Sequence, residues 1–295
     1  MLGVLTAPSG KSILKFSECN SMSLPSIRLP AVAGRFYPSL PEELVEMITS
    51  FAKAFSPPRR VFQNAIACLA PHAGYTYSGS VAYAVYSSLP ACQTFVVLGP
   101  NHFGRGHPLA TLDWNWETPL GIVSVDKEFS ASLLREMEEM AVDSQAHASE
   151  HSLEVQLPFL QHISKDFLFV PVAIGDTSYP VLEKLGRTLA RLIQTSPRRT
   201  LLVASSDMNH YEPDDVTREK DWKAIETILS LDPRALVEVL DREQISMCGY
   251  APAIAMLIAA RELGAVKGEL VKYATSADAG GDPSAVVGYA GIVIE

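Results

Sequence analysis

The chain has 295 residues and a formal net charge of −9 at neutral pH, from 24 basic and 33 acidic residues. Because nucleic-acid phosphates and anionic lipids attract basic surfaces, this balance argues against a nucleic-acid partner and against binding to a membrane surface. Hydrophobic residues make up 47% of the chain, enough for a sizeable core, yet no apolar stretch reaches the ~18 residues of a membrane-spanning helix.

The N-terminal region differs in composition from the rest of the chain. Residues 1–27 are rich in serine and show no periodic pattern, so we expect a flexible tail. The segment Arg28–Pro38 is expected to form a compact loop closed by prolines. Ser39 then precedes Pro41 and apolar residues at helical spacing, which predicts a helix capped by Ser39. Residues 28–295 contain no convincing linker and are expected to form one domain.

Strands and helices are expected to alternate along the rest of the chain. Continuous apolar runs between amphipathic segments are typical of strands buried on both faces, which predicts an α/β protein with three layers and a central sheet. The segment around Trp114 and Trp116 is expected to be a loop, and a helix is expected to begin at Ser149. Strands are expected near residues 65–69, 94–98, 122–125, 167–174, 200–204, 268–275 and 285–294, and further helices near 79–89, 127–141, 179–194, 216–230, 232–240 and 249–263.

Three of the predicted strands are followed closely by a histidine. His72, His102 and His210 each come a few residues after a short apolar run, and Asp207 lies beside the third. In open α/β sheets, ligands bind beyond the carboxyl ends of the strands, so these side chains are expected at one site. Such a group suggests a metal site or an acid–base site. Structural alternatives are that His72 caps a turn, and that Asp207 caps the next helix while His210 lies on the surface.

Glu150 and His151 are expected in the first turn of the helix that begins at Ser149. The helix dipole favours an acidic residue there, which explains Glu150 on structural grounds alone. A positive charge is disfavoured at the same place, so the dipole does not explain His151. A neutral His151 that acts as a base or as a hydrogen-bond donor is the functional interpretation.

Cys248 stands out among the cysteines because it directly precedes the helix predicted near residues 249–263. A helix N-terminus lowers the pKa of a thiol and favours the thiolate, which is the form that binds metals and acts as a nucleophile. Cys19, Cys68 and Cys92 show no paired spacing. This is typical of a protein from a reducing compartment without structural disulfides, and predicts a cytoplasmic location.

Several of these segments resemble the Memo family, which is named for a mediator of growth-factor-receptor-driven cell motility. The resemblance extends over roughly residues 28–295 and leaves out only the N-terminal tail. The segments that carry it are Ala70–Gly79 (APHAGYTYSG), Gly99–His102 (GPNH), Glu150–Pro158 (EHSLEVQLP), Ser205–His210 (SSDMNH) and Met247–Gly249 (MCG).

The resemblance implies a three-layer α/β/α fold with a mixed sheet, like that of the class III extradiol dioxygenases, which use non-haem Fe(II) to open catechol rings. In the dioxygenases the third metal ligand is a carboxylate. The resemblance to the Memo family places Cys248 at that position in this chain. Two imidazoles and a thiolate form a softer site that suits Fe(II), but also Cu or Zn. The resemblance implies the metal ligands His72, His102 and Cys248, with Asp207, His210 and His151 beside them.

Three functions are compatible with these residues. The leading hypothesis is a metal-dependent redox protein, with iron as the expected metal. In it, His151 and His210 move protons or hold a bound substrate or O₂, and Asp207 orients a ligand or serves as an extra one. The second is a non-enzymatic binding module for a phosphopeptide or another small ligand, because animal members of the family are described as binding phosphotyrosine peptides. The third is a cysteine hydrolase with Cys248 as nucleophile. Prokaryotic members are associated with a radical-SAM protein, which suggests a partner protein.

Overall fold

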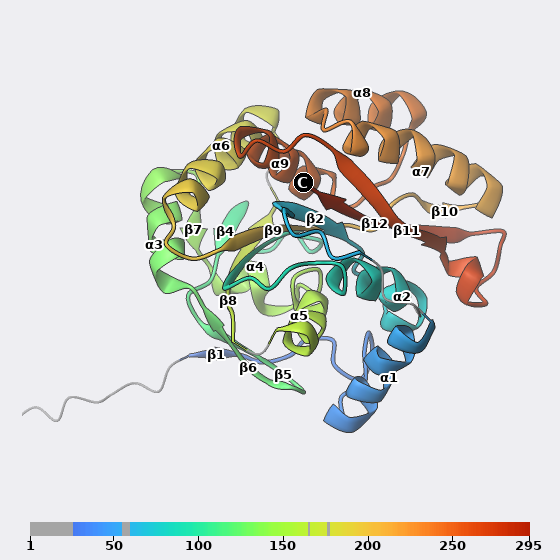
Figure 1. Ribbon diagram of the computed structural model, residues 1–295, viewed down its shortest axis with the longest axis horizontal. Coiled ribbons are helices and arrows are strands. Elements are labelled where there is room, and N and C mark those ends of the chain that lie inside the picture. Colours follow the sequence, from blue (N-terminus) through green and yellow to red (C-terminus); the bar gives the residue numbers. More distant parts are fainter. Residues whose placement is uncertain (1–25, 55–59, 165, 176–177) are drawn as a thin grey trace, which may run out of the picture.

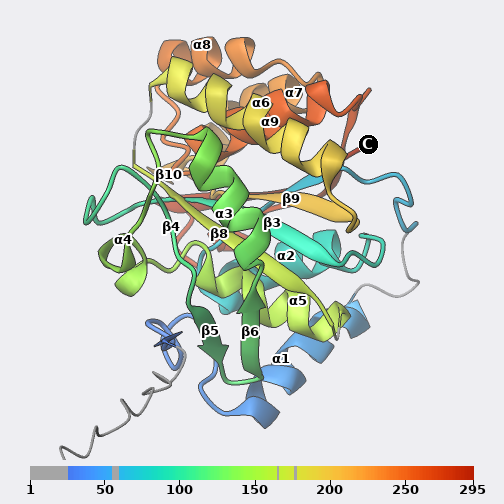
Figure 2. The same ribbon diagram turned by 90° about the vertical axis from the view of Figure 1, so that its left-hand side faces the viewer.

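The computed structural model describes residues 26–54, 60–164, 166–175 and 178–295 (Figure 1). Residues 1–25, most of the expected tail, lie outside this part of the chain. The described residues form a central sheet with helices on both faces, as predicted for an α/β protein (Figure 2). Among them, no helix combines the length and the apolar character needed to cross a lipid bilayer.

The sheet is mixed, with a parallel centre. Its strands are β1 (Ile27–Arg28), β2 (Ala67–Ala70), β3 (Thr94–Pro100), β4 (Leu109–Thr111), β5 (Asn115–Thr118), β6 (Gly121–Val125), β7 (Ala141–Val142), β8 (Leu168–Ile174), β9 (Thr200–Ser205), β10 (His210–Glu212), β11 (Gly268–Thr275) and β12 (Val286–Ile294). Strands β6, β8, β3, β9 and β2 are parallel neighbours in that order. Strand β12 pairs antiparallel with β2, β10 and β11. The carboxyl ends of β3, β9 and β2 therefore lie side by side.

Helices cover the two faces of the sheet unequally. They are α1 (Pro41–Ala54), α2 (Tyr75–Tyr86), α3 (Lys127–Glu136), α4 (Ser144–Ala148), α5 (Leu157–Ile163), α6 (Tyr179–Thr195), α7 (Asp214–Leu229), α8 (Pro233–Glu243) and α9 (Tyr250–Glu262), with the 3₁₀ turns η1 (Glu154–Gln156) and η2 (Ser276–Ala279). Helices α3, α6, α7, α8 and α9 lie over one face, and α1, α2 and α5 lie over the other (Figure 2).

Alternating strand residues supply the two halves of the core. Successive side chains of a strand point to opposite faces. Leu69 and Leu98 belong to the cluster that packs against α6 and α9, whereas Cys68 and Val97 belong to the cluster that packs against α1, α2 and α5. This is why the central strands read as continuous apolar runs in the sequence.

Two local predictions are wrong. The segment around Trp116 is not a loop but strand β5, because the Trp116 side chain is fully buried and its backbone pairs with β1 and β6. No helix begins at Ser149, which instead follows the last residue of α4 as its C-cap. The chain turns irregularly through Glu150 and His151 before η1, because the Glu150 carboxylate accepts the backbone N–H groups of this turn.

A candidate metal centre at the carboxyl edge of the sheet

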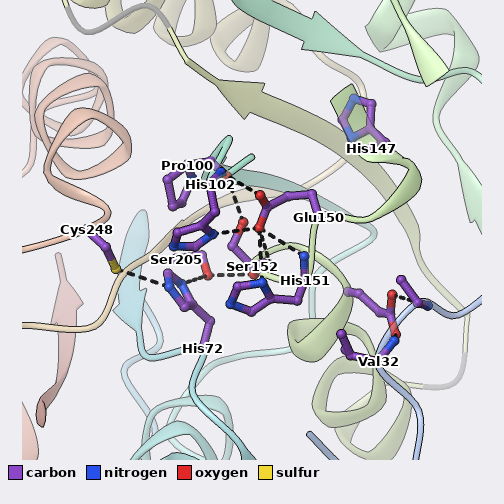
Figure 3. A network of polar contacts seen from close by, with 12 residues as sticks. Val32, His72, Pro100, His102, His147, Glu150, His151, Ser152, Ser205 and Cys248 are labelled. Atoms are coloured by element: carbon purple, nitrogen blue, oxygen red, sulfur yellow. Dashed lines mark hydrogen bonds and ion pairs between the residues drawn. The ribbon is translucent and has the colours of Figure 1, made fainter. Parts of the chain in front are cut away.

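The ends of three neighbouring parallel strands bring the candidate residues together. His72 follows β2, His102 follows β3, and Asp207 follows β9, so all three lie at one edge of the sheet. Figure 3 shows His72 and His102 side by side at this edge. His151 reaches the same place from the turn before η1. Cys248 reaches it from the segment before α9. The structure thus assembles residues that are far apart in the chain, at the edge expected for an open α/β sheet.

Three imidazoles form the centre of the site. One ring nitrogen from each of His72, His102 and His151 lies within 4.8 Å of the others. The rings of His102 and His151 are stacked with centroids 4.6 Å apart, and the His72 ring meets them edge-on at 5.1 and 5.4 Å. His72 is buried, whereas the side chains of His102 and His151 are 27% and 16% exposed. The cluster is therefore reachable from solvent on one side.

Cys248 lies on the other side of His72. Its Sγ atom is 3.1 Å from Nε2 of His72. Gly249 makes this approach possible, since a Cβ atom there would collide with the backbone carbonyl oxygen of Ser205 and with the Ser206 side chain. The expectation of a lowered thiol pKa is wrong for this structure, because burial and the nearby Asp207 raise the pKa of Cys248. Desolvation outweighs the helix N-terminus here.

Glu150 holds His102 in a defined orientation. Its Oε1 atom is 2.8 Å from Nδ1 of His102, and its Oε2 atom accepts the His102 backbone N–H at 2.7 Å. Burial opposes ionisation, but the hydrogen bond and charge of His102 and the N–H of Ser152 lower the pKa of Glu150 to about 2. Glu150 is therefore a carboxylate at neutral pH and accepts the Nδ1 proton. The Nε2 atom of His102 is left as the free ligand atom.

A buried ion pair supports the turn that carries Glu150 and His151. Arg28 pairs with Glu154, and the two side chains are 4% and 0% exposed. The guanidinium also donates to the carbonyl oxygens of His147 and Glu150, at 3.0 and 2.7 Å. Glu154 in turn accepts the Tyr37 hydroxyl at 2.6 Å. No local sequence pattern marks either charged residue, because the burial of a charge and its pairing with a residue far away in the chain are properties of the fold.

Asp207 supports the opposite side of the site. Its Oδ1 atom accepts the backbone N–H groups of His72 and Ala73, at 2.8 and 3.2 Å. Asp207 does not cap the following helix, so that structural alternative is wrong. Burial raises the pKa of Asp207 to about 6, against the effect of the two N–H donors. Its Oδ2 atom lies 4.0 Å from Nε2 of His72.

His210 and His151 remain uncharged at neutral pH. Burial lowers the pKa of His210, and its Nδ1 atom donates to the Ser246 carbonyl oxygen at 2.9 Å. Burial likewise lowers the pKa of His151 to about 4, and that of His72 falls well below its ordinary value for the same reason. A neutral imidazole is the form that binds a metal or accepts a proton.

The donor set fits a transition-metal ion. Imidazole nitrogens of three histidines converge within 4.8 Å, the other nitrogen of His102 is held by a carboxylate, and a thiol lies beside His72. Imidazole and thiolate are typical ligands of Fe, Cu and Zn, and a hydrogen bond to the second ring nitrogen is characteristic of metal-binding histidines.

Comparisons with known proteins agree with one another. The family model described as Memo-like protein matches residues 28–293. A MEMO1 family protein of Methanopyrus kandleri is 45% identical over 277 residues, covering 90% of this chain and 98% of its own. Those of Methanosarcina barkeri and Methanocaldococcus jannaschii are 42% and 43% identical, covering 91% of this chain and 100% and 99% of their own.

A similar fold is found among solved structures. An uncharacterized protein, JW3007, from Escherichia coli K12 superposes with a TM-score of 0.54 at 16% identity. The match covers 79% of this chain and 100% of the other.

Proposed function

The chain belongs to the Memo family, and on that premise we propose that it is a metal-dependent redox protein that binds one transition-metal ion at the His72–His102 edge of the sheet. The proposal is carried by one observation. Imidazole nitrogens from separate parts of the chain converge within 4.8 Å, and the second nitrogen of His102 is held by a buried carboxylate.

His72, His102 and Cys248 are the proposed ligands. Three protein ligands leave a coordination position open for a substrate, and a thiol loses its proton when it binds a metal even where burial raises its pKa. His151 completes the nitrogen cluster on the more open side, stacked on His102. We assign it, with His210 and Asp207, to moving protons or holding a substrate.

Fe(II) is the proposed metal, with Cu and Zn as alternatives. A bound Fe or Cu ion would supply one-electron chemistry. We also propose that the fold relates this chain to the class III extradiol dioxygenases, with Cys248 in place of their carboxylate ligand. A thiolate ligand in place of the carboxylate favours redox chemistry other than ring cleavage. The same proposal includes a small molecule or a peptide as the substrate, a radical-SAM-associated partner protein and a cytoplasmic location.

The cysteine-hydrolase alternative is less well supported. A nucleophilic cysteine needs a lowered pKa, and both burial and Asp207 raise that of Cys248. The binding-module alternative shares the metal proposal's residues, so metal content separates the two.

Metal analysis of protein prepared without oxygen tests the proposal. We expect about one equivalent of Fe per chain after reconstitution with Fe(II). His102→Gln and Cys248→Ser should each lose the metal, and His151→Gln should keep it. His162→Gln is the matched control, because His162 lies on α5, outside the cluster.

Two outcomes would contradict the assignment. Metal retained by Cys248→Ser but lost from His151→Gln would replace the thiolate with a third imidazole as ligand. Protein that takes up neither Fe, Cu nor Zn would refute the metal proposal as a whole and leave the binding module as the better hypothesis.

A further inference from the structure

The hydroxyl of Ser205, the last residue of β9, is completely buried and contacts three parts of the site. Figure 3 shows Ser205 next to His72 and Ser152. The Oγ atom of Ser205 lies 2.6 Å from the backbone carbonyl oxygen of Ser152 and 2.8 Å from Nε2 of Gln156. It also lies 2.9 Å from Nδ1 of His72. These contacts join β9, the turn that carries His151, and the histidine that follows β2.

The direction of each hydrogen bond follows from the chemistry of the partners. A carbonyl oxygen only accepts, so the single proton of the Ser205 hydroxyl goes to Ser152. Gln156 presents its amide nitrogen to Ser205, because the same nitrogen also lies 3.0 Å from the carbonyl oxygen of Pro71. The Tyr86 hydroxyl accordingly donates to the other end of the amide, at 2.7 Å from Oε1 of Gln156. The Ser205 oxygen can therefore only accept from its remaining neighbour.

That remaining neighbour is Nδ1 of His72, which must carry a proton. We infer that Ser205, oriented by Gln156 and Tyr86, is a positioning residue that fixes His72 as the Nδ1–H tautomer and turns the Nε2 lone pair toward Cys248. The contact of 3.1 Å between this Nε2 atom and Sγ of Cys248 agrees with the assignment, because a thiol can donate to a nitrogen lone pair.

The two proposed imidazole ligands therefore have different hydrogen-bond acceptors at Nδ1. His102 donates from Nδ1 to a carboxylate, whereas His72 donates from Nδ1 to a neutral hydroxyl. A charged acceptor makes the imidazole a stronger donor to a metal than a neutral acceptor does. Ser205 therefore selects the tautomer of His72 without adding negative charge to the buried side of the site.

The tautomer can be measured without any metal. In metal-free protein labelled with ¹⁵N-histidine, the two-bond ¹H–¹⁵N correlation pattern distinguishes Nδ1–H from Nε2–H. We expect His72 in the Nδ1–H form, a rise of the Nε2–H form in Ser205→Ala, and the native pattern in Ser205→Thr, which keeps the hydroxyl. Ser88→Ala is the matched control, because Ser88 is a buried serine whose hydroxyl bonds to Ala84, away from the site.

Metal affinity gives the second readout and rests on the proposed function. Loss of such an orienting hydrogen bond weakens metal binding about 10–100-fold, so we expect the Fe(II) dissociation constant of Ser205→Ala to rise by that factor. Native-like signals of His162 in every variant establish that the fold is intact.

The outcomes separate the inference from the proposed function. His72 in the Nε2–H form in the native protein, or an unchanged tautomer in Ser205→Ala, would overturn the inference. A native protein that binds no metal but loses the Nδ1–H form in Ser205→Ala would contradict the proposed function while supporting the role of Ser205.

Discussion

Two buried carboxyl groups flank the histidine cluster, and their pKa values move in opposite directions. Glu150 accepts the ring and backbone N–H groups of His102 together with the backbone N–H groups of His151 and Ser152, and its pKa is about 2. Asp207 accepts only two backbone N–H groups, and its pKa is about 6. Burial raises the pKa of both. The number and charge of the donors decides whether the buried group stays ionised.

The comparison extends to the two sides of the site. On the Glu150 side, the Arg28–Glu154 ion pair supports the turn, and hydrogen bonds from His102 and Ser152 keep Glu150 ionised at neutral pH. On the Asp207 side, no basic side chain forms an ion pair with the carboxyl group in the described part of the chain, apart from the distant contact with His72. The first side therefore carries a carboxylate that is ionised throughout the neutral range, and the second carries a carboxyl group that titrates near pH 6.

The largest expected effect concerns the Arg28–Glu154 pair. Glu154→Gln leaves the buried guanidinium without its counter-charge, which is expected to lower the free energy of unfolding by about 3–5 kcal/mol. Urea denaturation measures this. Glu183→Gln is the control, because Glu183 forms an exposed pair with Arg187 and should cost less than about 1 kcal/mol. Equal losses of unfolding free energy in the two variants would mean that the Arg28–Glu154 pair does not stabilise the Glu150 side of the site.

Glu150→Gln is expected to have the next largest effect. The folded-state pKa of Glu150, about 2, lies below its ordinary value of 4.5, so the carboxylate stabilises the fold above the ordinary pKa. This stabilisation, about 3 kcal/mol at neutral pH, is lost as the pH falls from about 5 to about 2. Urea denaturation of metal-free protein over this range should show the loss in the native chain but not in Glu150→Gln. If the free energy of unfolding depended on pH in the same way in both proteins, the lowered pKa of Glu150 would be contradicted.

Asp207→Asn is expected to change stability in the opposite direction and by less. The pKa of Asp207, about 6, lies above its ordinary value of 3.8, so ionisation in the folded protein destabilises it. The cost is absent below about pH 4 and complete above about pH 6. We expect Asp207→Asn to raise the free energy of unfolding by about 2 kcal/mol above pH 6, since weaker bonds to the amide offset part of the gain. If Asp207→Asn lowered the free energy of unfolding at neutral pH, the predicted opposite effects of Asp207 and Glu150 on stability would be contradicted.

Local patterns predicted most strands and helices of the fold. Apolar runs such as Phe95–Leu98 and Leu201–Ala204 lie inside β3 and β9, because strands buried on both faces need apolar side chains at every position. The position of His72 and His102 at one edge followed from the rule for open α/β sheets. Strand β5 was not predicted, because Trp116 is the one apolar residue among its four, and a single residue shows no alternation.

The sequence by itself determined which residues stand at the strand ends, and its motifs indicated the Memo family. Only the tertiary structure decided the protonation states of these residues. The helix that follows Cys248 predicted a thiolate, but burial beside Asp207 raises the thiol pKa. Glu150, Glu154 and Ser205 acquire their partners from segments far away in the chain. Desolvation and hydrogen bonding depend on which groups surround an atom in three dimensions, and a local pattern does not contain that information.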